Sequence, residues 1–192
     1  MRPVAAAVLV LGALVGVACR PGEPLPRIAQ VPAFQMRDQD GNAFTERELR
    51  GRTAIVSFMF TSCPDVCPIL TTKLSGVRTN LMVQREQLRF VSISVDPEKD
   101  TPAVLKDFAK KHGADYPDWR FVAGPIEQLR EVVVQGFKQS LERGDGSPNG
   151  IMHGTHLVLI DKAGMIRGFY RSDEEGLLLI ARDARRLIAG KE

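Results

Sequence analysis

The feature that most constrains this chain is an apolar, β-rich run, residues 53–60, followed almost at once by two cysteines with three residues between them. The run predicts a buried central strand, and the next segment has the apolar spacing of a helix. If this helix begins near Pro64, Cys63 and Cys67 lie one above the other on the same face. The positive end of the helix dipole favours thiolate there, and thiolates bind soft metals and attack disulfides. The motif therefore indicates a copper site or a redox dithiol.

The first 19 residues have the pattern of a targeting segment. Arg2 supplies a positive charge, and residues 5–17 form an apolar stretch of 13 residues, which is short for a membrane span. The stretch runs into Gly16-Val17-Ala18-Cys19, which resembles a bacterial lipobox, so we expect Cys19 to carry a lipid anchor. An uncleaved signal anchor is the alternative. Either one places the domain outside the cytoplasm, in the periplasm or on the outer face of the cell membrane.

The rest of the chain divides into a linker and one domain. Residues 20–32 contain four prolines, which predicts an extended tether. Residues 33–192 suffice for a single domain with its own core, because 44% of the chain is hydrophobic and 26% is charged. The net charge of +3 includes no basic block, which argues against nucleic acid as a partner.

The cysteine count supports a functional pair. If Cys19 carries lipid, Cys63 and Cys67 are the remaining thiols of the chain. A structural disulfide between them would close a very short loop and stabilise the fold little. In an oxidising compartment we therefore expect a pair that binds metal or forms a redox-active disulfide.

The apolar runs and turn signals predict the element order β-β-β-α-β-α-β-α-β-β-α. The early alternation favours right-handed parallel crossovers, and the last hairpin adds an antiparallel edge. This order indicates the α/β class, with a thioredoxin-like central mixed sheet flanked by helices and an extra N-terminal β-hairpin. We expect residues 139–150 to form a loop. The expected strands are 33–37, 42–44, 53–60, 88–95, 119–122, 155–160 and 165–170, and the expected helices are 68–85, 102–112, 125–135 and 173–189.

One of three histidines is the candidate third ligand. His112 ends an expected helix, where a capping role explains it, and His156 stands at the start of a strand. His153 precedes that strand, and in thioredoxin-like topology the entering loop lies beside the first helix N-terminus. Two thiolates and one imidazole suit copper, whereas zinc prefers a fourth ligand. His156 nevertheless stays open as an alternative to His153.

Three sequence blocks stand in order along the chain. They are Phe60-Thr61-Ser62-Cys63-Pro64-Asp65-Val66-Cys67-Pro68, then Ser92-Ile93-Ser94-Val95-Asp96-Pro97-Glu98-Lys99-Asp100-Thr101, and His153 placed eleven residues before Gly164. Together these blocks resemble the Sco/SenC family of copper proteins. The resemblance covers roughly residues 30–190 and implies a thioredoxin-like fold, with one copper ion held by Cys63, Cys67 and His153. It also implies a role in building the binuclear copper centre CuA of cytochrome c oxidase.

Three acidic residues lie close to these blocks. Asp65 favours the first helical turn through its charge, with tuning of the sulfurs as the alternative. Asp100 is expected to cap the helix that begins at Pro102. Asp96, in the same loop, is a candidate for docking a partner.

Two functions stay open. The first is a metallochaperone, and not an enzyme, whose client is the CuA-bearing subunit of cytochrome c oxidase, with other copper donors as further partners. The second is a thiol-disulfide oxidoreductase that reduces the cysteines of that subunit. Copper is favoured because redox thioredoxins have two residues between their cysteines and a proline where Gly154 stands. A peroxidase is disfavoured because Phe60, and not threonine, lies three residues before Cys63.

Overall fold

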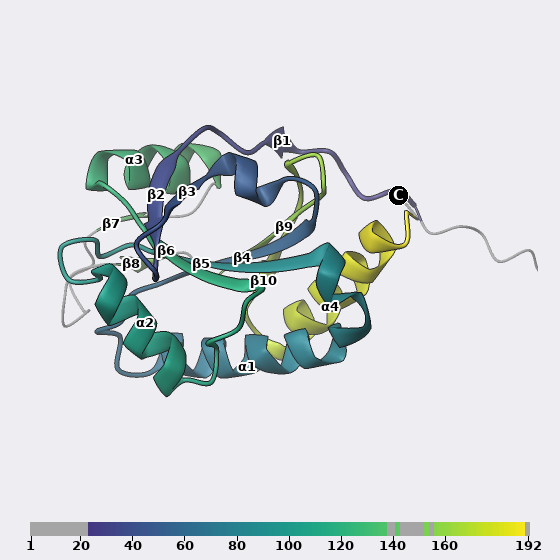
Figure 1. Cartoon of the computed structure of the whole chain (residues 1–192). Helices are drawn as coiled ribbons and strands as arrows, with labels where there is room; N and C mark the ends of the chain where they lie inside the picture. The colour runs from purple at the N-terminus through teal and green to yellow at the C-terminus, as the bar shows by residue number, and fades with distance from the viewer. Residues whose placement is uncertain (1–22, 138–140, 143–151, 154–155, 191–192) are drawn as a thin grey trace, which may run out of the picture.

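The computed structural model describes residues 23–137, 141–142, 152–153 and 156–190. Among these residues, eight strands form one mixed sheet and two short strands form a separate antiparallel ribbon (Figure 1). In spatial order the sheet contains β1 (Ala29–Gln30), β10 (Met165–Arg171), β9 (His156–Ile160), β4 (Thr53–Met59), β5 (Leu88–Ser94), β6 (Trp119–Ala123), β2 (Gln35–Asp38) and β3 (Ala43–Thr45). The ribbon consists of β7 (Leu141–Glu142) and β8 (Met152–His153).

The centre of the sheet is parallel and its edges are antiparallel. Strands β4, β5 and β6 run in parallel, and β9 lies antiparallel to β4. Every residue of β4 is buried, as expected for a central strand with both faces covered. The helical segments are η1 (Glu46–Leu49), α1 (Val66–Asn80), η2 (Met82–Gln87), α2 (Pro102–Lys111), α3 (Ile126–Arg130), η3 (Glu131–Gly136) and α4 (Glu174–Ile188).

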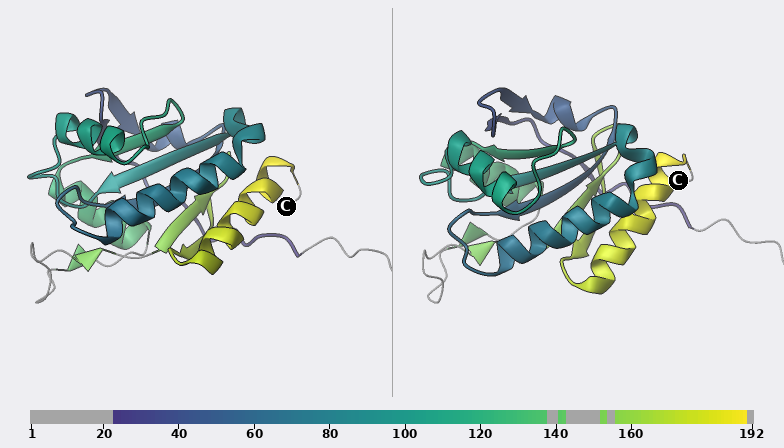
Figure 2. Two further views of the ribbon diagram at one scale, coloured as in Figure 1. Left: turned by 90° about the horizontal axis from the view of Figure 1, so that it is seen from below. Right: turned by 60° about the horizontal axis from the view of Figure 1, so that its bottom comes forward.

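The helices cover both faces of the sheet. Helices α1, α2 and α4 lie on one face, and α3 lies on the other (Figures 1 and 2). On the α3 side, the ring of Phe137 packs edge-on against Phe58 of β4, with 5.5 Å between the ring centroids. On the α2 side, Trp119 of β6 stacks on Phe121, and Phe108 of α2 packs against Phe121 in turn. The core is therefore double-layered, with β4 and β5 between the layers.

The predicted mixed sheet, its flanking helices and the N-terminal hairpin β2–β3 are all present. The first helix ends earlier than predicted, at Asn80 instead of residue 85. Its apolar stripe ends at the fully buried Leu81, and no residue of the following η2 is buried. The chain has no apolar face left to pack beyond this point, so the α-helix stops and a short 3-10 turn follows.

The segment predicted as a tether lies along the sheet edge from residue 23 onward. Its strand β1 pairs antiparallel with β10. The buried guanidinium of Arg167 donates hydrogen bonds to the backbone carbonyls of Leu25 and Pro26 and forms an ion pair with Asp161. The segment is thus extended but docked on the domain. None of the helices in the described ranges is both long enough and apolar enough to cross a membrane.

Candidate metal centre

The two cysteines flank the start of the first helix. Cys63 lies in the turn after β4, and Cys67 lies in the first turn of α1, which begins at Val66. The backbone N–H of Cys67 donates to the sulfur of Cys63, with 3.4 Å between the nitrogen and the sulfur. Both residues are present as thiols and both are buried, with 8% of Cys63 and 1% of Cys67 exposed. The predicted proximity of the two cysteines is confirmed, and the structure shows in addition that both side chains are buried.

The sulfur of Cys63 lies at the N-terminus of helix α1, where it accepts a hydrogen bond from the backbone. Burial alone would raise the pKa of this thiol. The thiol of Cys67 and three backbone N–H groups, those of Cys67, Asp65 and Val66, stabilise the charged sulfur and together outweigh burial, so that the pKa of Cys63 falls below its ordinary value. These are the N–H groups that a helix leaves unsatisfied at its start. The stabilised thiolate that the sequence predicts for this turn therefore belongs to Cys63.

Cys67 has the opposite character. Burial in the first turn of α1 raises the pKa of its thiol to about 12, even though Phe60 provides a backbone hydrogen bond that lowers it. The neighbouring sulfur of Cys63 and the negative charge of Asp100 raise it further. At neutral pH the thiol of Cys67 is therefore protonated, and it must lose this proton when its sulfur binds a metal ion or enters a disulfide. The site pairs one thiol with a lowered pKa and one with a raised pKa.

Asp100 fixes the turn that carries Cys63. Its carboxylate is 1% exposed and accepts hydrogen bonds from the N–H and the hydroxyl of Thr61 and from the hydroxyl of Ser94. The predicted capping role is wrong, because Thr101 is the residue whose side chain accepts from the backbone N–H of Val104 at the start of α2. The carboxylate of Asp100 instead joins the ends of β4 and β5, where it has three donors, two from the half-buried Thr61 and one from the buried Ser94.

The other two acidic residues have different roles. Asp65 is the exposed N-cap residue of α1, and its side chain makes no capping hydrogen bond. Its carboxylate can act on the helix only through charge. Asp96 is 5% exposed and lies 3.6 Å from the amino group of Lys99. It is therefore tied into its own loop.

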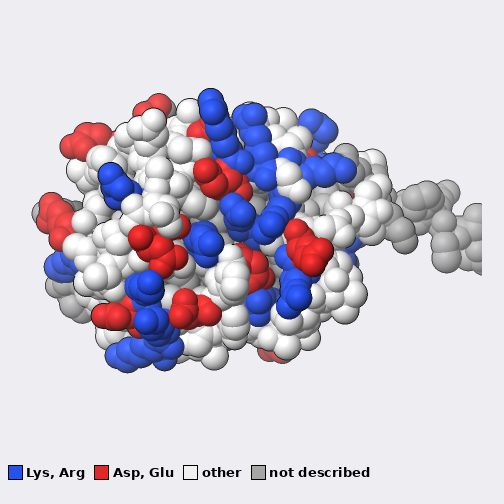
Figure 3. All heavy atoms as spheres, viewed as in Figure 1, with Lys and Arg blue, Asp and Glu red and all other residues white. Residues whose placement is uncertain are grey.

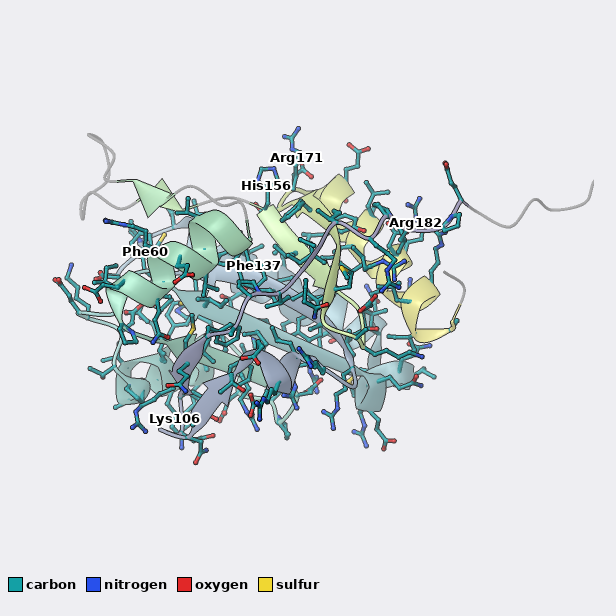
Figure 4. The ribbon with its side chains drawn as sticks, turned by 90° about the horizontal axis from the view of Figure 1, so that it is seen from above. Phe60, Lys106, Phe137, His156, Arg171 and Arg182 are labelled. Carbon is teal, nitrogen blue, oxygen red and sulfur yellow. The ribbon has the colours of Figure 1, made fainter. Side chains whose placement is uncertain are left out.

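The three histidines occupy different places. His112 ends α2, as predicted, with its ring 4.4 Å from that of Phe108. His156 begins β9, where it pairs with Arg171 at the end of β10. Figure 4 shows both side chains projecting outward from the domain. The backbone of His153 lies in β8, paired with Leu141, while its side chain is outside the described structure.

The β7–β8 ribbon lies at the dithiol end of the molecule. Figures 1, 2 and 4 place the ribbon at the end of the sheet where β4 finishes and Phe60 begins the cysteine turn. The register of β9 on β4 explains this position, because Val158 pairs with Val56 and the chain enters β9 from the carboxyl end of β4. The described side chains alone include no cluster of three metal-ligating groups. They supply two sulfur donors.

The model of the SCO1/SenC family matches residues 23–189. This chain belongs to the SCO1/SenC family. The resemblance inferred from the three sequence blocks is confirmed, and the thioredoxin-like fold with it. The family is involved in copper handling and in the assembly of cytochrome c oxidase.

Three solved structures illustrate the similarity. A SCO1/SenC family lipoprotein from Bacillus anthracis is 30% identical, with a TM-score of 0.75 over 82% of this chain and 94% of that one. ScoI from Bradyrhizobium japonicum, solved with copper bound, is 25% identical, with a TM-score of 0.69 over 83% and 99%. BsSco, described as a member of the Sco family of cytochrome c oxidase assembly proteins with a disulfide switch, is 26% identical, with a TM-score of 0.72 over 83% and 93%.

Proposed function

We propose that this chain is a membrane-tethered copper metallochaperone that binds one copper ion through Cys63, Cys67 and His153 and delivers it to the CuA-bearing subunit of cytochrome c oxidase. The observation that carries the proposal is the buried pair of thiols at the N-terminus of α1. Thiolate sulfur is a soft donor that suits Cu(I), and an imidazole nitrogen extends the donor set to Cu(II). ScoI from Bradyrhizobium japonicum, which shares this fold, has been solved with copper bound.

The asymmetry of the two thiols suits loading and release of a metal ion. Cys63 supplies a thiolate readily, because backbone N–H groups stabilise its charge. Cys67 must lose a proton when it binds metal, so metal binding and proton release are coupled. A three-ligand site leaves room for a ligand from the client to enter before the donor's own ligands leave. Transfer through such a shared intermediate needs no step in which bare copper is released.

The proposed location is the outer face of the cell membrane or the periplasm, with a lipid anchor on Cys19. The support is the apolar stretch of 13 residues that ends just before Cys19 and the Bacillus anthracis relative, which is described as a lipoprotein. The client site would face the same compartment. Mass spectrometry of the mature N-terminus tests this part of the proposal, because a protein that starts downstream of Cys19 has no such anchor.

A second candidate function rests on the same thiols. A thiol-disulfide oxidoreductase needs one thiol that attacks as thiolate and a second that resolves the mixed disulfide. The lowered pKa of Cys63 and the raised pKa of Cys67 fit this division of roles. The relative BsSco is described as having a disulfide switch. Under this alternative, Cys63 and Cys67 would reduce the cysteines of the oxidase copper subunit, and copper would enter later.

A genetic experiment separates the two functions. We expect deletion of the gene to lower assembled oxidase activity most under copper limitation, with partial rescue by added copper. A Cys63→Ser variant should fail to complement, whereas a Cys19→Ser variant should change where the protein resides. Full rescue by a membrane-permeant thiol reductant, with no response to copper, would favour the oxidoreductase and contradict the metallochaperone.

A further inference from the structure

The end of the domain opposite the dithiol carries an exposed apolar tip. Helix α1 has 15 residues, so its end lies about 22 Å from the cysteine turn at its start. The 3-10 turn η2 follows there and presents two apolar side chains, with 38% of Met82 and 92% of Val83 exposed. A single exposed apolar residue needs no explanation. Two neighbouring exposed apolar side chains at the tip of a turn, with arginines close by, do call for an explanation.

Arginines without acidic partners surround this tip. Arg52 and Arg85 line a hollow of about 430 Å³ together with Arg78, Glu86, Pro117 and Asp118. Arg78 forms an ion pair with Asp118, with 2.7 Å between nitrogen and oxygen. Within the described ranges, neither Arg52 nor Arg85 forms an ion pair. The hollow therefore has two available positive charges beside one glutamate.

Further cations extend the positive surface on both sides. Burial lowers the pKa of Arg89, and the charges of Arg52 and Arg120 lower it further, so Arg89 feels the charge of Arg52 even though its own guanidinium donates to the backbone carbonyl of Glu48 and Arg120 is ion-paired with Asp38. Arg185 of α4 donates to the backbone carbonyl of Asn80, immediately before η2. Figure 3 shows the larger group of Lys and Arg side chains in the upper middle of this view and toward the chain termini, with a second group at the lower left. Such a field attracts anionic surfaces.

The chain leaves the domain at this same end. The guanidinium of Arg186, in the last turn of α4, donates to the backbone carbonyl of Glu23. Helix α4 packs against both α1 and η2, which brings the first described residues to the side of the apolar tip. Figures 1 and 2 show both ends of the described chain on the side away from the β7–β8 ribbon. The segment expected to carry the anchor, residues 1–19, joins the domain here.

We propose that this end is a membrane-docking face, formed by Met82 and Val83 of η2 with Arg52, Arg85 and Arg185, which binds the headgroups of anionic phospholipids and directs the dithiol away from the bilayer. The inference rests on the lipid anchor in the proposed function and adds an orientation to it. Arginines bind phosphate oxygens with their planar forks, and apolar tips insert between headgroups. A domain held in this way presents Cys63 to a client instead of to the membrane.

Tryptophan quenching by brominated lipids tests the orientation. The full-length chain is reconstituted, free of metal, in vesicles of brominated phosphatidylcholine with or without phosphatidylglycerol. One variant carries Val83→Trp, and its matched control carries Ile69→Trp, at a residue 53% exposed on α1 near the dithiol. The native Trp119 is fully buried, so the unsubstituted chain provides the background.

We expect the lipid to quench the new tryptophan at position 83 and to leave that at position 69 unquenched, with the contrast stronger when phosphatidylglycerol is present and weaker at high salt. Adding Arg52→Gln and Arg85→Gln should shift the docked-to-undocked ratio by about fivefold for each arginine removed. Equal quenching at both positions, or none at position 83, would overturn the proposal. The emission of the tryptophan at position 83 is also recorded without vesicles. A blue shift of this emission that grows with protein concentration would assign the face to a second copy of the chain, and would likewise overturn the proposal.

The same samples distinguish this proposal from the proposed function. Copper is titrated into the reduced, reconstituted chain after the quenching measurement. If the quenching contrast is absent while copper binds one per chain, the docking face alone is wrong. If the contrast is present while copper does not bind, the metallochaperone is wrong and the docking face stands.

Discussion

The carboxylate of Asp100 holds Thr61 by both its backbone N–H, at 3.1 Å, and its hydroxyl group. Thr61 stands two residues before Cys63, so the loop after β5 determines where the cysteine turn after β4 lies. The same carboxylate accepts from Ser94 at the end of β5. Its charge also raises the pKa of Cys67. Asp100 therefore couples the position of one cysteine to the protonation of the other.

Asp100→Asn should destabilise the fold by about 1–3 kcal/mol, because the neutral amide offers one acceptor oxygen to the three donors that the carboxylate now satisfies. Urea denaturation of the reduced protein measures this change in the free energy of unfolding. Asp107→Asn is the matched control, since Asp107 is an exposed aspartate on α2, and it should change stability by less than about 0.5 kcal/mol. Equal stabilities for the two variants would show that the Asp100 network contributes nothing.

The two thiols should differ in their reaction with iodoacetamide. Cys63 should be alkylated first, and its rate should reach half its maximum at a lower pH than that of an ordinary thiol, because its folded pKa lies below the ordinary value of 9.0. Cys67 should still gain rate at the alkaline end of the range, because its thiol has a pKa of about 12. Fragment-ion mass spectrometry of the peptide that contains both residues assigns each modification. Faster alkylation of Cys67 than of Cys63 at neutral pH would contradict the proposed asymmetry.

Oxidation should control metal binding. A disulfide between Cys63 and Cys67 removes both sulfur ligands, so the oxidised protein should bind no copper at this site and reduction should restore binding. Metal-to-protein ratios before and after reduction measure the effect. The Cys63→Ser variant serves as the control, because it cannot form this disulfide and its residual binding should not respond to reductant. Stoichiometric copper in the disulfide form would place the site on other residues.

The sequence predicts the fold well because its signals are local. The apolar run of β4, the proline at the start of α2 and the glycine of the last hairpin each predict an element that the structure contains. Gly164 has a φ of 80°, as this tight turn requires. The docking of residues 23–31 on β10 was not predictable in this way, since it depends on Arg167, which is distant in sequence and buried.

The site is only partly predictable from the sequence, because some of its contacts join residues that are distant in sequence. Spacing places Cys63 and Cys67 on one turn, but tertiary structure decides which pKa falls and which rises, through hydrogen bonds to the sulfur of Cys63 and burial of the thiol of Cys67. Asp100 stands directly before Thr101 and Pro102, so local pattern assigned it to a helix cap. Its actual partner, Thr61, is 39 residues away. The sequence does contain a signal for this contact, because Asp100 belongs to one of the three family blocks. The block alone does not reveal that Asp100 lies beside the cysteine turn, since that contact forms only in the tertiary structure.

The ligand assignment is the central claim, and copper stoichiometry of the reduced chain tests it most directly. The unsubstituted protein should bind one copper per chain, and Cys63→Ser, Cys67→Ser and His153→Ala should each weaken Cu(II) binding sharply. His156→Ala is the matched control, because His156 is exposed at the start of β9 and projects outward. It should leave both the ratio and the copper absorption spectrum unchanged. Loss of the spectrum in His156→Ala, with an intact spectrum in His153→Ala, would contradict the proposed copper site.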